Sequence, residues 1–265
     1  MRRLARGLYR RLRSFRARGI NKSDFRSTYP RLVESLIRDH DTEQAMKLAV
    51  GGEFEAMGFL ELETLKHFGL GADSYVIDVG CGSGRLAKPL SQYLKGRYLG
   101  IDIVPELVDY ARRIVGRPDW RFELAGGLSI PEKDGEADVV CFFSVFTHLL
   151  HEQTYVYLQE AKRVLKPGGR IVFSFLDFTI PDHWHVFEST VAALGVNSDF
   201  LNVFIGKDAI RVWAEHLGLH VQAIEDGDKP SVPLSKPVVF EDGSVVEKVG
   251  SIGQSVCVLQ KRPRH

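Results

Sequence analysis

Cysteine is scarce in this sequence, and its three residues, Cys81, Cys141 and Cys257, lie far apart. Their spacing excludes a disulfide framework and fits no zinc-binding pattern, so we expect buried thiols in a reducing compartment. Long apolar runs are also missing, since no stretch approaches the roughly 20 residues that a membrane-spanning helix needs. An apolar core of the secretory type is absent from the N-terminus as well. We therefore predict a cytoplasmic protein.

Acidic residues are absent from positions 1–20, which hold eight arginines, so the rest of the chain is mildly acidic although the net charge is +1. Apolar residues recur there at helical spacing, at Leu4, Leu8, Leu12 and Phe15. A helix with that pattern would carry a narrow apolar stripe between guanidinium groups. We weigh five interpretations of this segment. It binds an anionic membrane surface, nucleic acid or an acidic patch on the protein itself, or it is an organellar presequence or a solvated chain end. The first would place the protein peripheral to a membrane.

The composition predicts an ordinary globular protein, because 44% of its 265 residues are hydrophobic and 26% are charged. This length accommodates one large α/β domain with appendages, which we expect, or two small domains. We place a basic arm at residues 1–20, a helical N-terminal cap at 21–70 and one domain at 71–265, with an insert at 178–206.

Helical spacing dominates residues 29–68, where Leu32 and Leu36 belong to one amphipathic stretch and Leu62 and Leu65 to another. Glycines at 69 and 71 then end the pattern. Between the two stretches, the glycines of residues 51–58 (GGEFEAMG) indicate a tight connection.

After residue 74 short apolar strands alternate with helices. We predict strands at 75–79, 98–102, 121–124, 139–143 and 170–175, and helices at 85–94, 105–115 and 152–165. Further strands follow at 220–224, 238–246 and 255–260. This alternation predicts a doubly wound, mostly parallel, Rossmann-like sheet with a helical N-terminal extension and antiparallel C-terminal strands.

The strongest signal is residues 76–87 (VIDVGCGSGRLA), a strand that leads through a glycine-rich turn into a helix. Glycine allows a ligand to approach the backbone, and a helix start offers unpaired N–H groups. Asp102 follows at the end of the next strand, where a carboxylate accepts hydrogen bonds from ribose hydroxyls. Gly82-x-Gly84-x-x-Ala87 also satisfies the loose dinucleotide fingerprint, so an NAD-dependent oxidoreductase is weighed.

Four segments in order carry a resemblance to a known family: residues 78–84 (DVGCGSG), 100–102 (GID), 137–140 (ADVV) and 164–170 (VLKPGGR). They resemble the first motif, the second acidic motif, the fourth-strand motif and the turn before the fifth strand of class I S-adenosylmethionine-dependent methyltransferases. The resemblance covers residues 75–176 and implies S-adenosyl-L-methionine as cofactor. A non-catalytic nucleotide-binding module of the same fold is the other alternative.

By this resemblance, glycines of the turn would meet the methionine portion of the cofactor, and Asp78 would hold its amino group through water. Asp102 would bind the ribose and Ile103 would pack on adenine. The acidic residue that family members carry after the third strand falls here on Gly126, so any contact there comes from backbone or a neighbour. We favour packing over redox chemistry for Cys81. The implied cofactor-binding residues are Asp78, Gly80, Cys81, Gly82, Gly84, Asp102, Ile103, Gly126, Gly127, Ser144 and Val145.

Methyl transfer to oxygen or nitrogen often uses a base, which must stand at the carboxyl ends of the fourth and fifth strands. His148, His151 and Asp177 are the candidates there. Alternatively, His148 lines the methionine pocket and His151 begins the following helix. Residues 183–185 (HWH) of the insert are candidates for the wall of an acceptor pocket or for a satellite core. We predict no metal site, because the histidines lack metal-type pairing with carboxylates.

Two sequence features that are missing here narrow the chemical class of the methyl acceptor. Residues 144–147 (SVFT) lack the Pro-Pro-aromatic signature of enzymes that methylate exocyclic base amines. Cys141 lies inside a predicted strand, where it is out of place as the catalytic cysteine that pyrimidine-carbon methylation requires. We therefore expect a small-molecule, lipid- or glycan-linked acceptor and favour nucleic acid less; RNA and protein acceptors stay open, and the sequence does not fix the oligomeric state.

Overall fold

A computed structural model of the chain describes residues 25–192 and 202–263. The predicted arm at 1–20 and part of the predicted insert lie outside these residues. The centre is a seven-stranded sheet in the order β3-β2-β1-β4-β5-β11-β6. Its strands are β1 (Val76–Val79), β2 (Tyr98–Asp102), β3 (Arg121–Leu124), β4 (Ala137–Phe142), β5 (Leu165–Phe175), β6 (Leu219–Glu225) and β11 (Ser255–Lys261).

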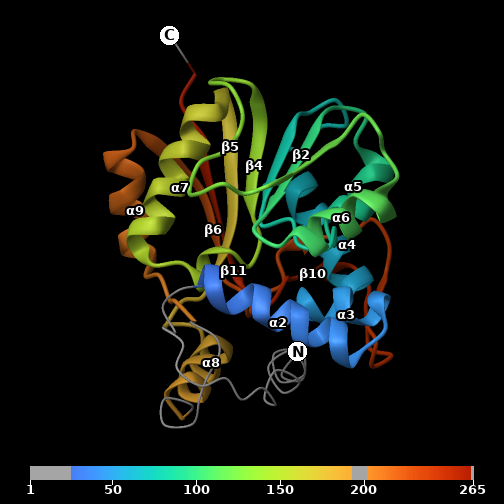
Figure 1. Cartoon of the computed structure of the whole chain (residues 1–265). Coiled ribbons are helices and arrows are strands. Elements are labelled where there is room, and N and C mark those ends of the chain that lie inside the picture. The colour runs from blue at the N-terminus through green and yellow to red at the C-terminus, as the bar shows by residue number, and fades with distance from the viewer. Residues whose placement is uncertain (1–24, 193–201, 264–265) are drawn as a thin grey trace.

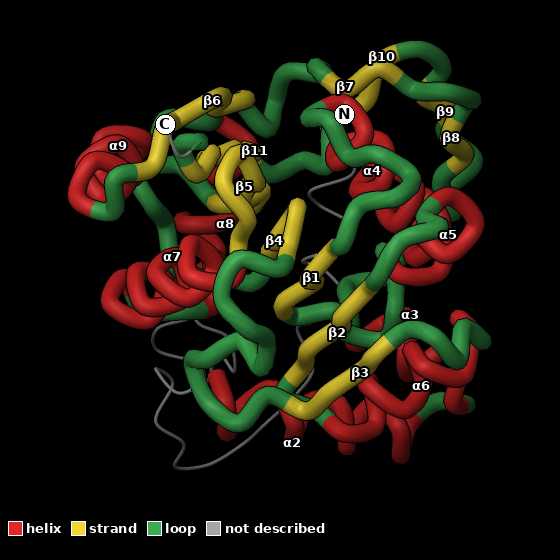
Figure 2. Tube along the Cα trace, turned by 90° about the horizontal axis from the view of Figure 1, so that it is seen from above, coloured by secondary structure: helices red, strands yellow, loops and turns green. Residues whose placement is uncertain are grey.

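Strands β1 to β5 pair in parallel, and β11 pairs antiparallel with both β5 and β6. Helices cover both faces of the sheet, as Figure 2 shows along the strands. One face carries α4 (Phe54–His67), α5 (Ala87–Tyr93) and α6 (Pro105–Val115), and the other carries α7 (His151–Val164) and α9 (Lys207–His216). The predicted doubly wound sheet with antiparallel C-terminal strands is confirmed.

The core follows from the two-residue period of the strands, because successive side chains point to opposite faces of a sheet. In β1, Ile77 packs with the α7 and α9 face, whereas Val76 packs with the α4 and α5 face. In β4, Val140 packs with the α7 and α9 face and Cys141 with the α4 and α5 face. Both faces are covered, which explains why these strands are continuously apolar rather than alternating.

Two helices, α2 (Phe25–Asp39) and α3 (Thr42–Ala49), lie across the lower end of the sheet in Figure 1. The Asp41 side chain caps α3 by accepting a 3.0 Å hydrogen bond from the backbone N–H of Gln44. The apolar side of α2 packs on α3 and on Leu107 at the start of α6. This packing holds the pair over the end of β2. We call α2 and α3 the cap.

Several boundaries of helices and segments in the structure differ from the predicted ones. Residues 51–58 are not all connection, because Phe54 begins α4, and Leu62 and Leu65 of that helix belong to the sheet core. The helix predicted at 85–94 begins only at Ala87, since the glycine turn extends through the preceding residues. The insert contains a helix, α8 (Pro181–Ala192), followed by a parallel bridge between Leu176 and Phe204. The boundaries of the arm, cap and main domain stay predictions.

The remaining strands form two small ribbons beside the sheet. β7 (Val232–Pro233) pairs with β10 (Val249–Gly250), and β8 (Val238–Val239) pairs with β9 (Val245–Val246). Residues 238–246 therefore turn back as predicted, although their strands are short. Over the described residues, no helix combines the length and the apolarity that crossing a bilayer requires.

Candidate functional site

The predicted site residues meet at the carboxyl edge of the parallel strands. Gly80 follows β1, Asp102 ends β2, Gly126 follows β3 and Ser144 follows β4. Strand order reverses direction here, because β1 lies between β2 and β4. Ligands of open α/β sheets bind at such a switch point.

The glycine turn is fixed by its own packing. Gly80, Gly82 and Gly84 all have positive φ, at 78°, 53° and 89°. A Cβ added to Gly80 would lie 2.3 Å from Val145 Cγ2, and one added to Gly82 would lie 2.5 Å from Val50 Cγ1. Both positions therefore require glycine for conformation and for close contact with valines. Contacts of these glycines with a cofactor stay predictions.

Asp102 is held as a buried hydrogen-bond acceptor. Its Oδ2 accepts a 2.9 Å hydrogen bond from the N–H of Gly82, and its Oδ1 accepts one of 3.0 Å from the N–H of Val104. An ionised carboxylate has about four acceptor sites, so acceptor capacity for the ribose is left. Burial raises the pKa of Asp102 to about 6, against the opposing effect of the backbone N–H groups. The group is therefore mainly ionised at neutral pH.

Asp78 lies on the side of β1 that faces α4, and it is only 2% exposed. Its oxygens accept hydrogen bonds from the Tyr98 hydroxyl at 2.8 Å and from the Cys141 thiol at 3.6 Å. Burial raises the pKa of Asp78 to about 7, which makes this carboxyl half protonated at neutral pH. Both oxygens thus have protein partners, and the predicted contact with the cofactor amino group stays a prediction.

A buried ion pair that the sequence did not reveal ties the glycine turn to the helices around it. The Arg85 guanidinium pairs with Glu61 of α4 and also donates to the Val50 carbonyl after α3. Ser83 Oγ donates to the Met46 carbonyl at 2.9 Å. The turn is therefore anchored to both the cap and α4. No sequence signal pairs residues this far apart.

Cys81 packs as predicted. Its side chain is 4% exposed, and its Sγ would lie 3.0 Å from a Cβ added to Gly100 on β2. Burial raises the pKa of this thiol well above its usual value, so it stays protonated and unreactive. The prediction of buried free thiols is confirmed for all three cysteines.

Ser144, two residues after the end of β4, adopts a left-handed conformation with φ of 58°. The Ser174 hydroxyl accepts its N–H at 2.7 Å, and its own hydroxyl accepts from Gln254 Nε2 at 3.1 Å. A non-glycine residue in this region is strained and is typical of binding sites.

After β3, Gly126 and Gly127 have nothing within 4 Å of an added Cβ, so this stretch borders open space.

The three candidate bases have different surroundings. His148 ends a short 3₁₀ turn, η1 (Phe146–His148), and its ring stacks on Phe25 of the cap. His151 begins α7, as the alternative interpretation predicted, and its Nε2 lies 3.0 Å from the Phe204 carbonyl. Asp177 is 1% exposed, and its Oδ2 lies 3.3 Å from Lys207 Nζ. Only His148 is joined to the cap by a described contact.

The two histidines of the insert, His183 and His185, lie on α8. His183 is buried, its Nδ1 accepts the N–H of Asp177 at 2.9 Å, and its Nε2 lies 3.0 Å from the Gly253 carbonyl. Burial lowers the pKa of His183, so the ring is neutral and Nε2 donates to that carbonyl. Trp184 packs with other aromatic rings of the insert, and His185 contacts Glu188. This arrangement matches the satellite core that was weighed for the insert.

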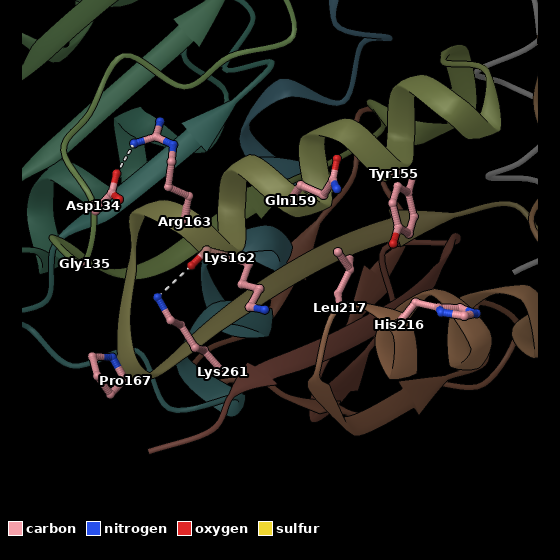
Figure 3. Close-up of a pocket in the computed structure, with 10 residues that line it drawn as sticks. All are labelled: Asp134, Gly135, Tyr155, Gln159, Lys162, Arg163, Pro167, His216, Leu217 and Lys261. Atoms are coloured by element: carbon pink, nitrogen blue, oxygen red, sulfur yellow. Dashed lines mark hydrogen bonds and ion pairs between the residues drawn. The ribbon is translucent and has the colours of Figure 1, made fainter. Parts of the chain in front are cut away.

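A surface groove of about 540 Å³ lies at the opposite edge of the sheet (Figure 3). Its lining includes the C-terminal part of α7, where Lys261 Nζ donates to the Lys162 carbonyl and Arg163 pairs with Asp134. The groove borders the start of β5 rather than the carboxyl ends of the parallel strands. It is therefore not the predicted cofactor site. Within the described ranges, no group of three or more His, Cys, Asp or Glu side chains is placed to hold a metal ion.

Comparison with known proteins identifies a methyltransferase domain over the parallel strands. A family model described as a methyltransferase domain matches residues 77–173. The chain is 28% identical to a ubiquinone biosynthesis O-methyltransferase of Xylella fastidiosa, covering 56% of this chain and 62% of that enzyme. It is 23% identical to the O-methyltransferase cnsE of Penicillium expansum, covering 71% of this chain and 72% of that protein.

A solved structure of a SAM-dependent methyltransferase from Methanosarcina mazei has the same fold, with a TM-score of 0.57 at 17% identity, covering 76% of this chain and 98% of that one. The chain covers between 30% and 72% of the length of the curated relatives that it matches first. These matches do not favour the NAD-dependent alternative. Residues 77–173 thus match a methyltransferase domain, and the sheet and the motifs around them support a class I S-adenosylmethionine-dependent methyltransferase with S-adenosylmethionine as cofactor.

Proposed function

We propose that this protein is an O-methyltransferase that moves a methyl group from S-adenosylmethionine to a hydroxyl of a small-molecule, lipid- or glycan-linked acceptor. The observation that carries the proposal is the buried Asp102 carboxylate beside the glycine turn, at the switch point of the sheet. The similar enzymes of Xylella and Penicillium are both named O-methyltransferases, which supports oxygen as the methylated atom.

The residues present fit the adenosyl group. Asp102 retains acceptor capacity for the ribose hydroxyls, and Ile103 lies in an apolar cluster with Val104 that provides a surface for the adenine ring. The open space beside Gly126 gives room at the end of β3. In this proposal Gly80 and Val145 border the methionine portion, because they lie at the ends of β1 and β4.

When bound, S-adenosylmethionine supplies an activated methyl group at a sulfonium. The acceptor hydroxyl would receive this methyl group and release its proton to bulk solvent, leaving S-adenosylhomocysteine as the second product. The protein's task is to align the acceptor with the methyl group and to exclude water. The cap covers one side of the glycine turn, since Val50 after α3 lies against Gly82 and the Met46 carbonyl of α3 accepts from Ser83 Oγ.

Proton removal is restricted by the contacts of the candidate bases. His151 makes a backbone contact on the α9 side of α7, and Asp177 is closed in by Lys207 and by the N–H of Thr179. We therefore assign no base role to His151 or Asp177. His148 is the candidate that contacts the cap, and its ring presents a face, rather than a nitrogen, to Phe25.

The test is transfer of label from methyl-labelled S-adenosylmethionine to hydroxyl compounds in a lipid and metabolite extract. We expect label in the extract with the full chain and none with the Asp102→Ala variant. Calorimetric titration should detect S-adenosylhomocysteine binding and no NADH binding. Absence of label in every fraction, with S-adenosylhomocysteine still bound, would favour the non-catalytic binding module.

A further inference from the structure

Hydrogen-bond acceptors without partners gather at the carboxyl edge of the sheet, on the side of β4 away from Asp102. Among the described residues, four buried side-chain atoms make no hydrogen bond, and three of them are oxygens of Asp177, Asp228 and Gln254. Asp177 follows β5 and Asp228 follows β6. β11 runs antiparallel to both strands, so Gln254, which precedes it, lies beside their ends. A buried acceptor without a donor costs roughly 1 to 3 kcal/mol, so three at one edge point to a bound group that supplies donors.

Gln254 Oε1 and Asp228 Oδ1 are the two acceptors that remain. Asp177 is excluded, because its Oδ2 lies 3.3 Å from Lys207 Nζ in an ion pair. Gly227 brings the other two residues together, since a Cβ added to it would lie 2.6 Å from the carbonyl carbon of Gln254. Both residues are half-buried rather than enclosed in the core. The pair therefore forms a small acceptor-rich site at the edge of the sheet.

Ser144 orients the Gln254 amide. Gln254 Nε2 donates to Ser144 Oγ at 3.1 Å, so the amide oxygen is the end left for a ligand. Ser144 is itself fixed, since its N–H donates to Ser174 Oγ at 2.7 Å. The neighbouring Val145 lies against Gly80, at the turn that borders the methionine portion in the proposed function. Gln254 thus lies beside the proposed methyl donor, on the side where an acceptor would enter.

We propose that Gln254 Oε1 and Asp228 Oδ1 bind hydroxyl groups of the methyl acceptor, which is therefore a polyhydroxylated molecule such as a sugar. This inference rests on the proposed function and deepens it by choosing the glycan-like class of acceptor. Amide and carboxylate oxygens only accept hydrogen bonds, and each hydroxyl donates one. A carboxylate or phosphate group is disfavoured, because it brings no donor and meets the Asp228 charge. Gln254 and Asp228 are specificity-determining residues in this proposal.

The first test identifies the class of the labelled product. The full chain is incubated with methyl-labelled S-adenosylmethionine and a metabolite and lipid extract, and the labelled product is acetylated and measured by mass spectrometry. Each free hydroxyl or amino group adds one acetyl group, and mild base then removes acetyl groups from oxygen but not from nitrogen. We expect several acetyl groups, all removed by base. A product without free hydroxyls, or one whose acetyl groups all stay on nitrogen, would overturn the proposal.

The second test asks whether the two residues contact the acceptor. With the extract fraction that supports transfer, Gln254→Leu and Asp228→Leu should each raise KM for the acceptor about ten-fold, since each removes one hydrogen bond, and should leave S-adenosylhomocysteine affinity within about three-fold. Gln260→Leu is the matched control, because Gln260 lies at the opposite end of β11 and its amide donates to the Gly168 carbonyl at 3.2 Å. An unchanged KM in both variants would contradict the proposal. Failure of the proposed function looks different, because no fraction of the extract would then carry label, and the inference would fall with it.

Discussion

Replacing Asp102 with asparagine should weaken S-adenosylhomocysteine binding by about a hundred-fold. Both carboxylate oxygens accept a backbone N–H, from Gly82 and from Val104. An amide in either orientation therefore turns its NH₂ group toward one of these donors, and it offers the ribose no charged acceptor. Hydrogen bonds to charged groups contribute roughly 1.5 to 3 kcal/mol each. A net loss of about 3 kcal/mol is about a hundred-fold in Kd.

The assay is calorimetric titration of the purified full chain with S-adenosylhomocysteine at pH 7.5. Asp109→Asn is the matched control, because that carboxylate is exposed on α6 and pairs with Arg112. Thermal unfolding of Asp102→Asn should show a modest loss of about 1 to 3 kcal/mol, since one buried backbone N–H then faces the amide NH₂ instead of an acceptor. An affinity within three-fold of the unchanged protein, with the fold intact, would refute the ribose assignment.

Further predictions concern pH, the buried ion pair and the arm. The pKa of Asp102, about 6, predicts that S-adenosylhomocysteine affinity falls about ten-fold between pH 7 and pH 5, and that Asp102→Asn removes this dependence. The pKa of Asp78 is raised to about 7, so its protonated form stabilises the fold below about pH 4 and this stability is lost as pH rises through 7. In denaturant unfolding, Asp78 should contribute a decline of up to about 1.4 kcal/mol per pH unit, which Asp78→Asn removes while the decline due to Asp102 stays. Arg85→Met should cost roughly 3 to 5 kcal/mol of unfolding free energy by leaving Glu61 unpaired, and adding Glu61→Leu should recover most of it. Deleting residues 1–20 should remove salt-sensitive sedimentation with anionic vesicles; equal sedimentation would exclude a membrane contact.

The sheet was predicted from hydrophobic patterns over short stretches of the sequence. The strand at 98–102 and the helix at 105–115 were predicted at their observed bounds, because the apolar runs and Pro105, which suits a first helical turn, mark them. The order of the motifs also placed Asp102 and the glycine turn at one edge, since parallel strands bring their carboxyl ends together. These features depend on residues that are close in the sequence.

Contacts between distant segments were not predictable in this way. Val50 packs on Gly82, Glu61 pairs with Arg85, and Phe25 stacks on His148, and each pair joins the N-terminal helices to the main domain. Helical spacing shows that a helix has an apolar side without showing which surface it covers. For the same reason the interval 51–58 looked like a connection, although Phe54 already begins a buried helix.

A structure of the full chain with S-adenosylhomocysteine tests the central claim most directly. We predict that both ribose hydroxyls lie within about 3 Å of the Asp102 carboxylate, with the thioether below the Gly80 turn. A ligand bound elsewhere, for instance in the groove beside Lys261, or a pocket that excludes S-adenosylhomocysteine and holds a nicotinamide instead, would contradict the account.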